Sequence, residues 1–208
     1  MIRTVTVLFA LLTIVASAAL AVSPPEDQGF AVLGIYTQPE ASEDAAVMLE
    51  DVDAGVPYTI YFVMYHHRLD SYNLGGFEFS WSIEPSEMAP MVLETTYNNE
   101  QAYNFGDSFN QLVGFAWRQP TAPDAPLLLF SAEIMFLTPP TNANVYLGAA
   151  VPASIDGEMV YADLVFPDTL KVMKPNNSSQ SLDEPVFKFN PVVATEYQSL
   201  SSVKSLFQ

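Results

Sequence analysis

Two adjacent histidines, His66 and His67, are the only histidines of the chain and belong to a residue type that often ligates transition metals. They end a run rich in aromatic and β-branched residues, which predicts a strand. Neighbouring side chains of a strand point to opposite faces, so the two rings can share one ion only if the strand ends there. The following Arg68-Leu69-Asp70 predicts such an end. An ordinary turn is the alternative to a metal site, and we expect the turn.

Acidic residues are densest in the next candidate region, which precedes that strand. Ca²⁺ takes about six to eight oxygen ligands, often carboxylates and carbonyls of one loop. Glu50, Asp51 and Asp53 are therefore candidate calcium ligands. The sequence contains no Asp-x-Asp-x-Asp-Gly loop, and a solvated acidic surface is the alternative for this segment. We expect no cofactor other than calcium.

Four glutamates are candidates for the paired carboxylates of a glycoside hydrolase, which lie a few ångströms apart across a cleft. They are Glu78, Glu84, Glu87 and Glu133. Chance pairs are common in a chain with 24 Asp and Glu residues. The sequence also lacks Gly-x-Ser-x-Gly, His-Glu-x-x-His, a glycine-rich phosphate loop and cysteine. We therefore expect no catalytic residues.

Aromatic residues in polar segments are candidates for ligand contact, because exposed rings stack on sugars or anchor protein partners. Tyr97, Tyr103 and Phe105 lie in such a segment and are the residues that we expect to bind a ligand. A structural role is the alternative for all three. Tyr72 also lies in a polar segment, whereas Trp117 shares a strand face with apolar residues and is expected in the core.

The element that positions two of the glutamates is a predicted strand from Leu74 to Pro85. Successive strand side chains point to opposite sides, so its large apolar residues fall on one face and its polar residues on the other. The apolar set is Phe77, Phe79, Trp81 and Ile83, and the polar set is Glu78, Ser80, Ser82 and Glu84. The apolar face belongs in the core, so we expect binding on loops or on the polar face.

Strand-like runs with turn signals between them recur along the chain without a long stretch of helical periodicity. This pattern is typical of an all-β fold, and we expect a single antiparallel β-sandwich, jelly-roll or Ig-like, over residues 30–190. Residues 155–158 predict a hairpin turn. The expected strands cover residues 30–37, 46–49, 56–66, 74–85, 91–96, 111–118, 127–137, 145–151, 158–162, 169–173 and 185–189.

The two ends of the chain have different characters. Arg3, an uncharged run and small residues before Ala21 predict a secretory signal peptide over residues 1–21. An uncleaved anchor is the alternative, but the run is interrupted by Thr and Ser and is shorter than the about 20 residues that span a bilayer. Residues 22–29 are expected to be a flexible leader. Residues 191–208 form a tail that can make a short amphipathic helix, with Leu200, Val203, Leu206 and Phe207 on one face.

Composition limits the partners. The formal net charge is −17, and cleavage after Ala21 makes it one unit more negative by removing Arg3. Nucleic acid and anionic membranes are polyanions and therefore poor partners, and we expect no membrane span after cleavage. The absence of cysteine argues against the small, disulfide-stapled class of eukaryotic secreted proteins and favours bacterial export. We expect a secreted protein, extracellular or periplasmic.

Several segments resemble those of a known family. The alternating run Gly76-Phe-Glu-Phe-Ser-Trp-Ser-Ile-Glu-Pro-Ser-Glu-Met88 resembles a cohesin strand followed by its acidic turn, and Leu127-Leu-Leu-Phe-Ser-Ala-Glu-Ile-Met-Phe-Leu137 is similar to a later strand. Leu147-Gly-Ala-Ala150 and the Asp156-Gly157 turn extend the likeness to residues 30–173. The resemblance is to the broad group of cohesin-like and carbohydrate-binding sandwiches. It implies a sandwich of about nine strands that binds a protein or glycan without catalysis.

Three function classes follow, in order of preference. The first is a secreted, non-catalytic recognition or attachment module that binds an extracellular protein or polysaccharide, with protein ahead. The second is a structural, self-assembling subunit joined through open strand edges or the tail. The third is a jelly-roll glycoside hydrolase. The sequence leaves the oligomeric state open.

Overall fold

The computed structural model describes residues 29–41, 47–86, 90–122 and 125–191, without the side chains of residues 116–118. The predicted signal peptide, nearly all of the leader, and the apolar residues of the tail lie outside these ranges. The described residues form twelve strands and no α-helix. Among them no helix of bilayer-spanning length and apolarity exists.

In chain order the strands are β1 (Ala31–Tyr36), β2 (Met48–Leu49), β3 (Pro57–Tyr65), β4 (Asn73–Glu84), β5 (Met91–Tyr97), β6 (Ala102–Asn104), β7 (Asn110–Pro120), β8 (Leu127–Met135), β9 (Ala143–Gly148), β10 (Met159–Asp163), β11 (Leu170–Pro175) and β12 (Phe187–Phe189). All of the expected strands are present, with ends shifted by a few residues.

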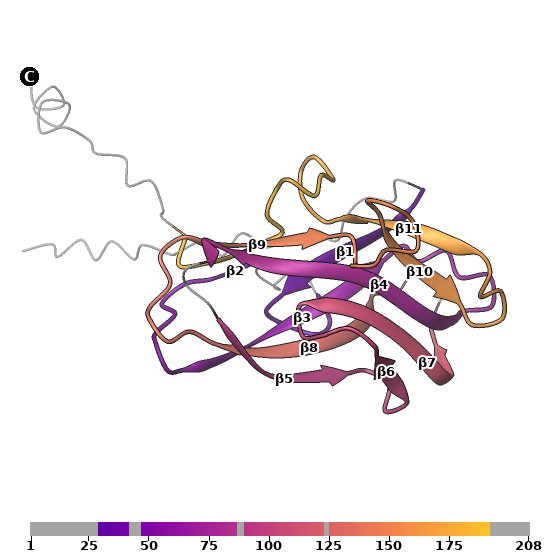
Figure 1. Ribbon diagram of the computed structural model, residues 1–208, viewed down its shortest axis with the longest axis horizontal. Coiled ribbons are helices and arrows are strands. Elements are labelled where there is room, and N and C mark those ends of the chain that lie inside the picture. Colours follow the sequence, from indigo (N-terminus) through magenta and orange to yellow (C-terminus); the bar gives the residue numbers. More distant parts are fainter. Residues whose placement is uncertain (1–28, 42–46, 87–89, 123–124, 192–208) are drawn as a thin grey trace, which may run out of the picture.

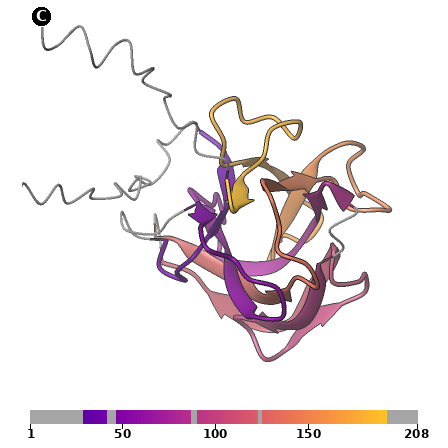
Figure 2. The ribbon, with the colours of Figure 1, turned by 90° about the vertical axis from the view of Figure 1, so that its left-hand side faces the viewer.

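The strands fold into two facing layers. The hydrogen-bonded order is β2-β12-β9-β4-β10-β11-β1-β3-β8-β5, with β7 on the second edge of β4 and β6 beside β7. Figure 1 shows β9 and β4 lying above β8 and β5, and the end view in Figure 2 shows the strands curling around a common interior. The predicted all-β sandwich is confirmed.

Two details differ from the expected antiparallel sandwich and from the about nine strands that the family resemblance implies. The pairs β1–β11 and β2–β12 are parallel, and each joins a strand from the first part of the chain to one from the last part. The strand number is larger because short pairings such as β6 and β2 add to the main strands. Only β6 was absent from the expected set, since its three residues, Ala-Tyr-Asn, are too few to show an alternation.

Aromatic rings fill the space between the layers. Phe62 of β3 stacks on Phe130 of β8, with ring centroids 4.2 Å apart. Across the interior it meets two rings of β4, Trp81 at 5.3 Å and Phe79 at 5.9 Å. The whole apolar face of β4 is buried, as predicted from its alternation. These contacts hold β4 against the opposite layer.

The predicted hairpin at residues 155–158 is wrong, although the turn exists. The amide of Glu158 donates to the carbonyl of Ile155 at 3.1 Å. The flanking strands do not pair with each other: β10 pairs with the first half of β4 and β9 with its second half. Turn chemistry is local and does not select the strand that an element will join. Residues 149–158 are therefore an excursion between two strands that occupy the same edge of β4.

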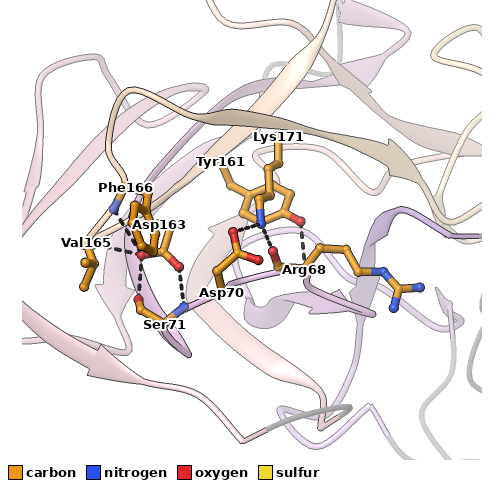
Figure 3. Close-up of polar contacts among 8 residues, drawn as sticks. All are labelled: Arg68, Asp70, Ser71, Tyr161, Asp163, Val165, Phe166 and Lys171. Carbon is orange, nitrogen blue, oxygen red and sulfur yellow. Dashed lines mark hydrogen bonds and ion pairs between the residues drawn. The ribbon is translucent and has the colours of Figure 1, made fainter.

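A buried carboxylate closes one end of the sandwich (Figure 3). Asp163 at the end of β10 is fully buried and accepts hydrogen bonds from the amide and hydroxyl of Ser71, at 2.8 and 2.5 Å. It also accepts from the amides of Val165 and Phe166, at 2.8 and 3.3 Å. Burial by itself raises the pKa of Asp163, but these hydrogen bonds outweigh it and hold the pKa below its usual value. The ionised side chain thus joins the loop after β3 to the loop after β10.

Replacement of the stacked core ring should destabilise the fold strongly. We expect Phe130→Ala to lower the free energy of unfolding by about 3–5 kcal/mol, because it leaves a cavity among packed rings. Chemical denaturation monitored by circular dichroism measures this. The matched control is Phe105→Ala, whose side chain is 80% exposed and should cost less than about 1 kcal/mol. Equal losses in the two variants would contradict the assigned core.

Asp163→Asn should lower the free energy of unfolding by about 2 kcal/mol at pH 7, because an amide cannot accept all of these hydrogen bonds. The folded-state pKa is lowered, so the stabilisation is present above the ordinary pKa of 3.8 and is lost as pH falls through the folded value. The difference between the two proteins should therefore shrink below about pH 4. Urea unfolding over a pH series tests this. Asp70→Asn, at a side chain 65% exposed, should change stability by less than about 0.5 kcal/mol; a gap that is constant with pH would argue against the ionised clamp.

Candidate functional site

A rigid turn between β6 and β7 presents an exposed aromatic ring. Asn104 accepts from the amides of Gly106 and Leu112, both at 3.0 Å, and donates to the carbonyl of Asp107 at 2.9 Å. The amide of Phe105 donates to the carbonyl of Leu112 at 2.9 Å. A Cβ at Gly106 would lie 1.9 Å from the carbonyl oxygen of Asn110, so only glycine fits. The Phe105 side chain is nevertheless 80% exposed.

The excursion after β9 lies across the polar face of β4. The hydroxyl of Ser80 donates to the carbonyl of Ala149 at 2.8 Å. The amide and hydroxyl of Ser154 donate to the two carboxylate oxygens of Glu78, at 3.1 and 2.8 Å. Half of the polar face that we expected to be open is therefore used to hold this segment.

Asn110, at the start of β7, fixes the same segment from the other side. Its side-chain amide donates to the carbonyl of Val151 at 2.7 Å and accepts from the amide of Val151 at 2.9 Å. The excursion is thus tied to both β4 and β7.

A hollow lies between the β6–β7 turn and the excursion. One side is formed by Phe105 and the outer face of β7, the other by the excursion, and Glu78 of β4 contributes the carboxylate. A Cβ at Gly114 would lie 3.8 Å from Cε2 of Phe105, so the ring rests beside the bare backbone of β7. The lining residues are Glu78, Phe105, Leu112, Val113, Gly114, Pro152, Ala153 and Ser154.

The three predicted ligand-binding aromatics have different environments. Phe105 lines the hollow, and Tyr103 is 57% exposed on the preceding strand without being among the lining residues. Tyr97 instead packs on Phe130 at 5.6 Å and donates to Oε1 of Gln111 at 2.7 Å. Burial raises the pKa of Tyr97 to about 12. Tyr97 thus packs toward the core, whereas Tyr103 and Phe105 are exposed, and ligand binding by these three residues stays a prediction.

The proposed calcium ligands lie on an exposed turn before β3. Glu50, Asp51 and Asp53 are all exposed, and the amide of Asp53 donates to the hydroxyl of Tyr58 at 2.8 Å. In the ranges that the structure covers, no three His, Cys, Asp or Glu side chains are grouped so as to hold a metal ion. Calcium binding at these residues stays a prediction.

The histidine pair follows a strand end, as expected. Strand β3 ends at Tyr65, and His66 has a positive φ of 51°. His67 is buried, with Nε2 3.0 Å from the carbonyl oxygen of Ala122. The two residues thus belong to a turn that packs against the loop after β7.

The glutamates considered for hydrolysis do not share one cleft. Glu78 points outward from β4, whereas Glu133 lies opposite Glu94 on β8 in the other layer. The buried faces of both strands point inward, so these carboxylates lie on opposite outer surfaces. Glu84 is exposed, and Glu87 lies outside the described residues, as does the side chain of Trp117.

Comparison with known proteins gives a weak likeness at the level of the fold. No protein-family model and no curated protein matches the chain. Among solved structures, a cohesin module from the family 33 glycoside hydrolase of Clostridium perfringens ATCC13124 is similar, with 11% identity, 71% of this chain and 97% of the module covered, and a TM-score of 0.38. The resemblance noted in the sequence is thus found at this level. It assigns no role to any residue of the hollow.

Asn110→Ala should loosen the excursion without unfolding the sandwich. Both hydrogen bonds to Val151 are lost, and each contributes about 1 kcal/mol, so amide exchange at Val151 should quicken at least about tenfold. Hydrogen exchange followed by NMR measures this. Asn98→Ala, an exposed asparagine in the loop after β5, should leave that rate unchanged. Unaltered protection in the Asn110 variant would show that the excursion does not depend on this pair.

Proposed function

We propose that the chain is a secreted, non-catalytic recognition or attachment module whose contact surface is the hollow beside Phe105. A protein of the extracellular or periplasmic space is the first partner class and a polysaccharide the second. The observation that carries this proposal is the 80% exposure of Phe105 on a turn fixed by its own hydrogen bonds. A ring exposed to water on a rigid support gains apolar contact on binding without a large loss of conformational entropy.

The surroundings of the ring support recognition more than chemistry. The carboxylate of Glu78 is held by Ser154 and no second carboxylate is among the described lining residues. A pair of carboxylates is what glycoside hydrolysis requires. Beside Phe105 and Leu112, the hollow is lined by small residues such as Gly114, Ala153 and Ser154, which leave room for a group that the partner inserts.

Self-assembly through the edge strand β5 has less support. Strand β5 ends the hydrogen-bonded order and carries an irregularity between Val92 and Glu94. Glu94 lies directly opposite Glu133, so the edge is both bent and negatively charged. Bulges and charges on an edge strand disfavour the addition of another strand.

The test uses the mature chain, residues 22–208, immobilised and exposed to extracellular proteins and insoluble polysaccharides from the source organism. We expect Phe105→Ala to lower retention of the partner about tenfold or more, because buried aromatic anchors dominate such contacts. The matched control is Phe166→Ala, a ring 50% exposed on the loop after β10, which should retain the partner as the wild type does. Equal retention by Phe105→Ala would contradict the assigned surface. Failure to retain either class would contradict the function.

A further inference from the structure

We infer that the hollow beside Phe105 accepts a cationic side chain, lysine or arginine, presented by a partner protein. This inference rests on the proposed function and specifies the chemistry of the group that enters the site. It follows from the side chains around the hollow and from the charge of the whole chain.

The first argument is the composition of the lining. The described lining residues include one carboxylate, Glu78, one aromatic ring, Phe105, and neither lysine nor arginine. An ammonium or guanidinium group is attracted both by a carboxylate and by the face of an aromatic ring. A neutral apolar group would gain from Phe105 but would remove water from Glu78 without compensation.

The second argument is the state of Glu78. Ser154 donates one hydrogen bond to each carboxylate oxygen, at 3.1 and 2.8 Å, whereas an ionised carboxylate offers about four acceptor positions. Ser154 therefore fixes the orientation of Glu78 and leaves acceptor capacity on both oxygens. A guanidinium or ammonium group has N–H donors that can bond to these free acceptor positions.

The third argument is the support of the ring. The backbone amide of Phe105 donates a hydrogen bond to the carbonyl of Leu112, and Cε2 of the Phe105 ring lies beside Gly114, which carries no side chain. The backbone that carries the ring is thus held next to the hollow, while most of the ring surface is exposed to solvent. A ring in this position can form a cation–π contact with little reordering.

The fourth argument is charge complementarity over a longer range. The chain has a formal net charge of −17, with 24 acidic and only 7 basic residues. An acidic surface raises the rate at which cationic partners arrive, and salt weakens this effect. The hollow then provides the point at which one of the partner's cations is held.

The experiment titrates the ¹⁵N-labelled mature chain with Nα-acetyl-arginine methylamide, with the lysine analogue, and with the neutral citrulline analogue. We expect saturable chemical-shift changes of the Gly114 and Ser154 amides with the two cations. The affinity for the citrulline analogue should be at least about threefold lower. The affinity for the cations should fall at 0.5 M salt, because charges are screened. Glu78→Gln and Phe105→Ala should each weaken the arginine response about threefold or more. Glu84→Gln removes an exposed carboxylate of β4 that is absent from the hollow lining and should have no effect.

Gly114→Val is a second test that leaves Glu78 and its bonds to Ser154 in place. The Cβ meets only the Phe105 ring, at 3.8 Å, so the variant should fold, and its branched side chain should occupy the space between the β7 backbone and Phe105 and weaken the arginine response. Equal responses to arginine and citrulline, shifts spread over the acidic surface, or full binding by the Gly114 variant would overturn the inference. If the inference fails but partner retention still depends on Phe105, the proposed function stands and only the cationic nature of the bound group is wrong.

Discussion

The packing of Phe62 against Phe130 and against the rings of β4 is the interaction on which the rest of the molecule depends. Strands β3 and β4 share no backbone hydrogen bonds, so their association rests on these ring contacts. Because β4 pairs with three other strands, fixing it also fixes them. The outer surface of β4 and β7 then supports both the β6–β7 turn and the excursion of residues 149–158.

Much of this fold could be predicted from the sequence, because the two-residue period of a strand assigns each side chain to a face from only a few neighbouring residues. Alternation assigned the inward face of β4 correctly. Which strands pair with each other could not be predicted. No local pattern distinguishes a strand that pairs with the preceding strand from one that pairs with a third strand. This is why residues 155–158 indicated a hairpin. The parallel joining of β1 and β11 depends likewise on residues more than a hundred positions apart.

The candidate site was predictable only in part, and the reason lies in tertiary contacts. Tyr97 and Phe105 belong to the same polar, aromatic segment, and composition alone treats them alike. Tyr97 is drawn inward by Phe130 and Gln111, while Phe105 projects from a turn. Ser154 gave no signal, because its importance comes from a carboxylate 76 residues earlier in the chain. The polar face of β4 was identified correctly, but its use as an anchor was not.

The excursion between β9 and β10 has a consequence for how such a protein can diversify. Each of the two strands has its own register on β4, so the pairing does not depend on the length or composition of the segment between them. Insertions, deletions and substitutions in residues 149–158 would therefore be tolerated by the sheet. One wall of the hollow can therefore change in sequence and length while the aromatic interior and the strand pairing stay the same.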